Sequence, residues 1–150
     1  MNKAKFDHIL KTQLPIAWIA GVRFGHYDNN TFSTYVEFDF LNQNPFGSMF
    51  WAVEGMAAEF CGGMMLLEKI EATGKSFSTL VVKNEVVFTK KAIGKITFTC
   101  NQGALIEQEL KTAIETNEPR TFTLTSIGID EAGDQVANFA FTWSIKMRNK

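Results

Sequence analysis

The sequence has few of the residues on which disulfide frameworks, metal sites and polyanion-binding surfaces depend. Its two cysteines, Cys61 and Cys100, lie in apolar segments without a CxxC or Cys/His spacing, which argues against a zinc site and a disulfide scaffold. There are 15 Lys and Arg residues and 16 Asp and Glu residues, so the formal net charge is −1. No block of like charges attracts nucleic acid or anionic lipid. We therefore expect no metal, no nucleic-acid partner and no membrane partner.

Signals for export and for membrane insertion are also missing. Lys3 and Lys5 are followed by no apolar signal core and no small-residue cleavage site. The stretch 45–67 is apolar over a length that could cross a bilayer, yet Glu54 and Glu59 lie near its middle, where ionisable groups are costly in hydrocarbon. We therefore predict that this stretch is a buried helix and that the protein is cytoplasmic.

The length and the aromatic content predict one domain that is rich in β-structure. A chain of 150 residues has the size of a single domain with one core, so residues 1–150 are treated as one unit. Fourteen phenylalanines recur at strand-like spacing, which is typical of a sheet with an aromatic face. The hydrophobic periods predict helices at 3–13, 48–73 and 104–116, and strands at 22–28, 31–40, 79–89, 93–101, 120–129 and 135–146.

Turn residues between neighbouring strands favour antiparallel pairing. The segments 22–28 and 31–40 are predicted to form a hairpin, and 79–89 and 93–101 to turn near 91–94. The long helix is predicted to begin at Ser48 as its N-cap and to end at Gly74. It is apolar on nearly all sides, so other elements of the fold must cover it. The fold class is therefore α+β, an antiparallel sheet of about six strands around one long central helix. Alternation predicts inward side chains at Phe32, Thr34, Val36, Phe38, Phe40, Leu80, Val82, Val86, Phe88, Phe139, Phe141, Trp143 and Ile145.

The chemically unusual residues gather between Asn44 and Glu59. A polar loop and Gly47 precede the long helix, whose free N–H groups and positive dipole end could polarise a carbonyl. Glu59 lies on a stripe of otherwise small and apolar residues, where burial would raise its pKa as a general base requires. Glu54 lies about 140° around the helix, so it cannot serve the same site. An ordinary capped helix with structural, hydrogen-bonded acids remains the alternative.

The spacing Asn-x-x-Gly-Ser, with an acid fifteen residues after the Asn, resembles the hotdog-fold acyl-CoA thioesterases related to phenylacetyl-CoA thioesterase. The resemblance implies that Asn44 and Gly47 position the thioester, that Glu59 acts as base or nucleophile, and that amides near Ser48 and Met49 bind the carbonyl. It also implies a homodimer joined edge to edge, with the possibility of a tetramer, and coenzyme A as part of the substrate rather than as a cofactor.

The chain departs from that family at the start of the helix. Phe50 and Trp51, followed by an alanine, stand where many relatives have His-Gly-Gly, and we expect the two aromatic side chains to line the substrate site. The chain also resembles an uncharacterised thioesterase-like branch that carries a domain of unknown function, by the runs Asn-Pro-Phe-Gly-Ser-Met-Phe at 44–50, Glu-Phe-Cys-Gly-Gly at 59–63 and Lys-Asn-Glu-Val-Val-Phe at 83–88. The polar residue that the family places on the third strand, which a neighbouring subunit contributes in some members, falls near Ser78 or Thr79. Lys83 could meet the phosphates of coenzyme A, although strand-end lysines often only protect an edge.

These observations predict an acyl thioester hydrolase. A ligand-binding protein of the same fold, without turnover, is the first alternative, because the bulky Phe50 and Trp51 crowd the helix start. A dehydratase or isomerase on the same scaffold is a second alternative, suggested by Glu54, although that chemistry needs a histidine near the helix start and none is present there.

Overall fold

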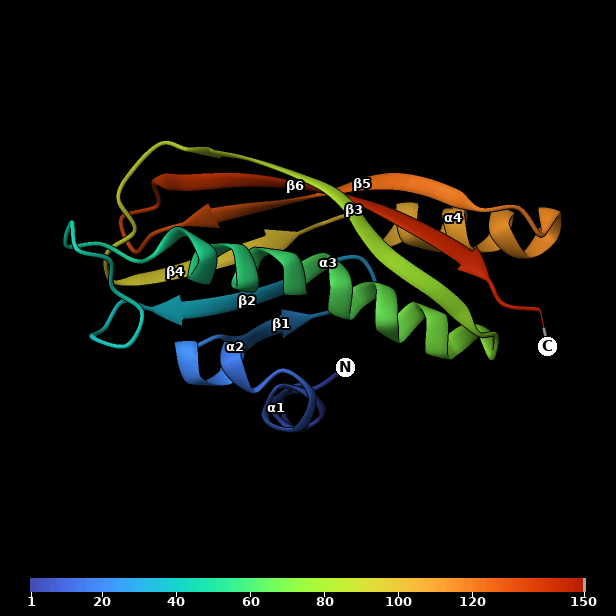
Figure 1. The fold of residues 1–150 in the computed structure, drawn as a ribbon, viewed down its shortest axis with the longest axis horizontal. Helices are drawn as coiled ribbons and strands as arrows, with labels where there is room; N and C mark the ends of the chain where they lie inside the picture. Colours follow the sequence, from blue (N-terminus) through green and yellow to red (C-terminus); the bar gives the residue numbers. More distant parts are fainter. Residues whose placement is uncertain (150) are drawn as a thin grey trace.

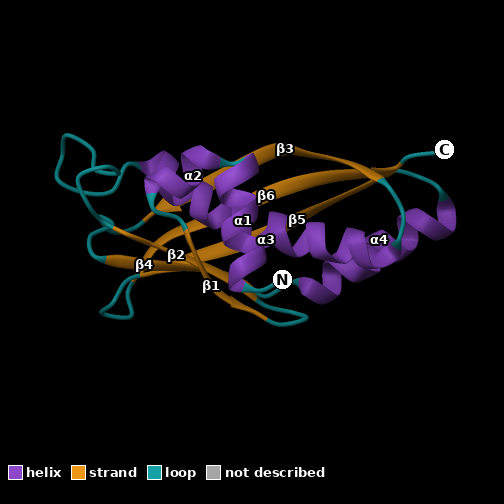
Figure 2. Ribbon diagram, turned by 90° about the horizontal axis from the view of Figure 1, so that it is seen from below, coloured by secondary structure: helices purple, strands orange, loops and turns teal. Residues whose placement is uncertain are grey.

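The computed structural model describes residues 1–149 and has six strands in one antiparallel sheet, which curves around α3 (Figure 1). The strand order is β1-β2-β4-β5-β6-β3. Helices α1, α2 and α3 lie in front of the sheet when it is seen from below (Figure 2). This is the hotdog arrangement, so the predicted fold class is confirmed. The elements are α1 (Lys3–Gln13), α2 (Pro15–Ala20), β1 (Arg23–Tyr27), β2 (Phe32–Glu37), α3 (Trp51–Thr73), β3 (Phe77–Phe88), β4 (Lys95–Cys100), α4 (Gly103–Thr116), β5 (Arg120–Ile129) and β6 (Gln135–Met147).

Helix α3 ends where the sequence predicts but begins later. Gly74 adopts a left-handed backbone with φ +65° and stops the helix. The predicted N-cap, Ser48, is wrong, because the residue before the helix is Phe50 and no side chain caps it. Ser48 is engaged in the preceding loop, where its hydroxyl accepts from the side-chain amide of Asn44. Within residues 1–149, no helix is long and apolar enough to cross a membrane.

Strand β3 is at the edge of the sheet and does not form the hairpin with β4 that the turn residues predict. It pairs along its whole length with β6, whereas β4 lies between β2 and β5. An irregularity between Val81 and Lys83 interrupts the alternation of β3. The predicted inward positions Leu80 and Val82 are wrong, since these side chains are 63% and 50% exposed. Phe88 lies on the inward face as predicted, where it packs against the buried Phe139 of β6, although it is partly open to solvent at the end of the strand. The outer edge of β3 has no neighbouring strand among the described residues.

The predicted second strand ends three residues early. Phe32, Thr34 and Val36 are buried as expected, but the strand stops at Glu37. The prediction for Phe40 is wrong, since this side chain is 81% exposed. The cause lies in the side chain of Asn42, which donates to the carbonyl of Glu37 and accepts from the amide of Asp39, so the chain bends away from the sheet.

A second short helix, α2, was not predicted. Pro15 ends the pattern of α1, as expected, but it also occupies the first turn of α2. Proline is favoured there because the missing N–H would have no partner inside the helix.

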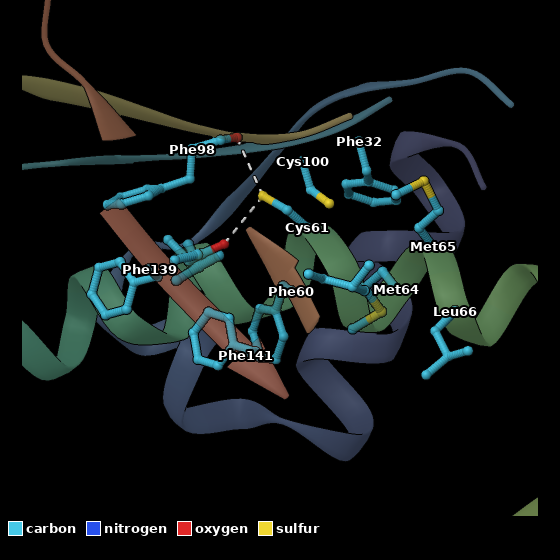
Figure 3. Close-up of a cluster of buried hydrophobic side chains, with 14 of the residues drawn as sticks. Phe32, Phe60, Cys61, Met64, Met65, Leu66, Phe98, Cys100, Phe139 and Phe141 are labelled. Carbon is cyan, nitrogen blue, oxygen red and sulfur yellow. Dashed lines mark hydrogen bonds between the residues drawn. The ribbon is translucent and has the colours of Figure 1, made fainter. Parts of the chain in front are cut away.

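The core lies between α3 and the concave face of the sheet (Figure 3). The Cys61 thiol donates to the carbonyl oxygen of Phe98 at 3.2 Å, and burial raises its pKa to about 12, so it packs as a neutral group. The hydroxyls of Thr34 and Ser126 donate to carbonyls of α3 at 2.7 Å. Gly62 lets β5 approach, because a Cβ there would lie 2.8 Å from Leu124. These contacts hold α3 in a fixed rotation, which decides where Glu54 and Glu59 point.

Candidate functional site

Glu54 and Glu59 of α3 line different cavities. Glu59 lines a cavity of about 300 Å³, here called the Glu59 cavity, together with Thr79, Trp143 and apolar residues of α1 and α3. Glu59 also lines an adjoining cavity of about 460 Å³ that reaches Trp51 and Ala52 at the start of α3. Glu54 lines a third cavity of about 570 Å³, here called the Glu54 cavity. The helical geometry thus separates the two carboxyl groups, as the residue spacing predicts.

Glu59 lies in surroundings that bring the pKa of its carboxyl group close to neutral pH. Burial, with no hydrogen bond or charge to offset it, raises the pKa of Glu59 to about 7. Gly63 makes room for this carboxyl group, because a Cβ at residue 63 would lie 2.8 Å from Oε1 of Glu59. A carboxyl group that exchanges its proton at neutral pH can act as a general base.

Trp143, which lines the Glu59 cavity, has a hydrogen-bond donor that the sequence did not single out. Trp143 on β6 is 7% exposed, and its indole Nε1–H has no partner among residues 1–149. A buried donor without a partner is costly, which makes Trp143 a candidate donor to a ligand at this site. The sequence gives Trp143 only as an inward position of a strand, and nothing in the pattern indicates that it shares a cavity with Glu59.

The predicted partner of Glu59, Asn44, does not line either cavity of Glu59. Its Nδ2 donates to Oγ of Ser48 and to the carbonyl of Met49, both at 3.1 Å, and its Oδ1 accepts from the amides of Phe46 and Ser48. The side chain therefore shapes its own loop and lines the Glu54 cavity. Gly47, at φ +77°, is the exposed turn of this loop.

The amides that were predicted to bind a carbonyl are occupied. The amide of Ser48 donates to Asn44, and the amide of Met49 donates to the carbonyl of Ala92 at 2.9 Å. The first turn of α3 itself, at Trp51 and Ala52, offers N–H groups without helical acceptors. Both residues line the adjoining cavity with Glu59.

The aromatic pair at the helix start lies at the surface. Phe50 and Trp51 are 45% and 55% exposed, and their ring centroids are 5.9 Å apart. Trp51 lines both the Glu54 cavity and the adjoining cavity, so it forms part of the wall between them.

The remaining predicted binding residues lie on β3. Thr79 lines the Glu59 cavity. Lys83 is exposed, forms an ion pair with Glu85 at 2.9 Å and lines none of the three cavities. Within the described part of the chain, no group of three or more His, Cys, Asp or Glu side chains is placed to hold a metal ion.

Comparison with solved structures gives the same fold from several organisms. A Pseudomonas aeruginosa protein of unknown function, described as a probable thioesterase, is 20% identical, with a TM-score of 0.85 over 99% of this chain and 97% of that chain. A Chlorobaculum tepidum protein of unknown function is 14% identical, with a TM-score of 0.82 over 97% and 94%. A Haemophilus influenzae thioesterase is 11% identical, with a TM-score of 0.73 over 98% and 92%.

Comparison by sequence identifies a family but no protein of known activity. No curated protein matches the sequence. Residues 2–145 match the family described as "Domain of unknown function (DUF4442)", which is nearly the whole chain. The protein therefore belongs to the DUF4442 family and has the fold of the thioesterase-like hotdog proteins.

Proposed function

We propose that the protein hydrolyses an acyl thioester, such as an acyl-CoA, with Glu59 as the general base. The observation that carries the proposal is the carboxyl group of Glu59 in an apolar cavity, where burial raises its pKa to about 7. The descriptions of two structurally similar proteins as thioesterases support the same chemistry. Neither histidine lines any of the three cavities, which disfavours a dehydratase that needs one.

The adjoining cavity suits the reacting carbonyl, because Glu59 and the first turn of α3 both line it. Ionised Glu59 takes a proton from a water molecule while the water oxygen bonds to the thioester carbon. The N–H groups of Trp51 and Ala52 stabilise the oxygen that becomes negative. The C–S bond then breaks, and the proton passes from Glu59 to the sulfur, so a carboxylic acid and a thiol leave. A positioned base contributes about 10²- to 10⁴-fold to such a rate.

The Glu59 cavity suits the acyl group. Phe60, Met64, Leu66, Leu67 and Ile70 line it, and these side chains favour a hydrocarbon. Trp143, whose indole N–H has no partner, would donate to an oxygen of the substrate or of the attacking water.

A homodimer through β3 is part of the proposal. Leu80, Val82 and Val87 are exposed on this strand, and its outer edge has free backbone groups that a second copy could pair with. Pairing there would also bring Thr79 and Lys83 close to the partner subunit. The test is sedimentation of L80K, in which a charge on this edge should shift the protein toward monomers.

The test of hydrolysis is thiol release from short, long and aromatic acyl-CoAs by the wild type, Glu59→Gln and Glu37→Gln. Glu37 is exposed at the end of β2 and serves as the matched control. We expect E59Q to lose at least about 100-fold in kcat/KM while E37Q keeps wild-type activity. Equal activity of E59Q and the wild type on a hydrolysed substrate would refute the role of Glu59.

A ligand-binding protein without turnover is the second candidate. The observation that favours it is the side chain of Asn44, which is committed to its own loop instead of being free to position a thioester. In that case calorimetry would detect binding of an acyl-CoA to the wild type, and no acyl-CoA of the panel would release thiol.

A further inference from the structure

Glu54 is a buried acid that the proposed hydrolysis does not use. It is the fourth residue of α3 and is 4% exposed. Its Oε1 has no hydrogen-bond partner among residues 1–149, and burial raises the pKa of this group to about 7. An unpaired buried oxygen costs free energy, and nothing in the described chain compensates that cost.

The other polar side chains that line the Glu54 cavity are already engaged. Asn44 and Ser48 bond within their loop, and the hydroxyl of Thr89 donates to the carbonyl of Gln135 at 2.7 Å. The rim lysines are engaged too: Lys90 pairs with Asp130 at 2.5 Å and Asp134 at 2.8 Å, and Lys91 donates to the carbonyl of Phe46 at 3.0 Å. Among the side chains that line this cavity, Glu54 is therefore the one with a buried polar atom that has no partner within residues 1–149.

The rest of the cavity is aromatic and open to solvent. Its volume of about 570 Å³ is that of a small-molecule site. Four large aromatic side chains line it and are exposed. Exposed clusters of this kind are uncommon away from binding surfaces, so they indicate a binding site. They come from the loop, the helix start and the end of β3: Phe46, Phe50, Trp51 and Phe88.

We propose that the Glu54 cavity is a second binding site, separate from Glu59, for a small molecule with a flat apolar body and one neutral carbonyl, amide or hydroxyl group. The apolar body lies among Phe50, Trp51 and Phe88, and the neutral polar group pairs with the carboxyl group of Glu54. A protonated carboxyl group both donates and accepts, so an amide can satisfy it fully. An anionic ligand binds more weakly, because its charge would be desolvated beside the buried acid and would disfavour ionisation of Glu54.

The site is tested by fluorine NMR titration with three probes of similar size: 4-fluorobenzamide, 4-fluorobenzoate and 4-fluorotoluene. We expect the wild type to bind the amide about tenfold or more tightly than the benzoate, as one good hydrogen bond allows. In proton–nitrogen correlation spectra, the backbone N–H signals of Trp51 and Phe88 should shift when 4-fluorobenzamide is added. The signal of Gly63, beside Glu59, should not shift.

Three variants separate the contribution of Glu54 from non-specific binding to the apolar surface. Glu54→Leu should weaken the benzamide about tenfold and leave the fluorotoluene unchanged, because only the polar partner is lost. Glu54→Gln, whose amide also donates and accepts, should retain benzamide binding, and so should Glu59→Gln. The proposal is overturned if the wild type binds no benzamide at millimolar concentration, if Glu54→Leu binds it equally well, or if Glu59→Gln abolishes binding. None of these outcomes depends on whether the protein hydrolyses thioesters.

Discussion

Glu54→Gln should stabilise the protein at alkaline pH and much less at acidic pH. Burial raises the pKa of Glu54 from 4.5 to about 7, so between these values the folded protein holds a proton that the unfolded chain has released. Stability therefore falls as pH rises through this window. A difference of about 2.5 pH units corresponds to about 3 kcal/mol at pH 8 and less than about 1 kcal/mol at pH 5. Glutamine has the same shape and carries no charge, so it escapes this penalty.

Urea unfolding followed by tryptophan fluorescence measures the effect at both pH values, at one fixed protein concentration. The stability difference between E54Q and the wild type should grow by about 2 kcal/mol from pH 5 to pH 8 in favour of glutamine. Glu37→Gln, at an exposed position, should show no such growth. If the difference for E54Q is the same at both pH values, Glu54 is ionised in the folded protein without penalty, and the description of its surroundings is wrong.

Three further substitutions have defined outcomes. Gly63→Ala should push the Glu59 carboxyl group aside and lower kcat about 10- to 100-fold, with a Tm no lower than that of the wild type. Asn44→Ala removes the hydrogen bonds of its loop and should lower the free energy of unfolding in urea by about 1 to 2 kcal/mol. Gly103→Ala should lower it by at least about 2 kcal/mol, because the added Cβ would lie 2.3 Å from the carbonyl oxygen of Asn29. A G103A protein as stable as the wild type would contradict this packing.

Local periodicity predicted the parts of the fold that depend on one segment alone. The alternation in β6 places Phe139, Phe141 and Trp143 in the core, as found, since side chains of a strand point to opposite faces. The apolar circumference of α3 predicted its burial. The position of β3 in the sheet was not predictable in this way. β3 pairs with β6, which is distant in the sequence, and the turn residues at 91–94 contain no information about that pairing.

In the candidate site, too, the features that depend on one segment could be predicted and those that depend on tertiary structure could not. The angle between Glu54 and Glu59 follows from helix geometry, so their separation could be predicted. The relation of Asn44 to Glu59 could not, because it depends on how the loop before α3 folds, and that loop is closed by its own hydrogen bonds. Trp143 becomes a candidate donor only because β6 passes over α3.

The pairing of β3 with β6 means that β3 cannot complete its sheet contacts until β6 has been synthesised. A ribosome delivers β3 well before β6, so the core-facing side chains of Phe77, Val81 and Val86 lack their sheet neighbour while β4, α4 and β5 are made. Nascent chains with an unpaired strand are prone to aggregate. A message truncated before Gln135 would release β3 with no partner in the sheet, and the cell would have to treat that fragment as a substrate for chaperones or proteases.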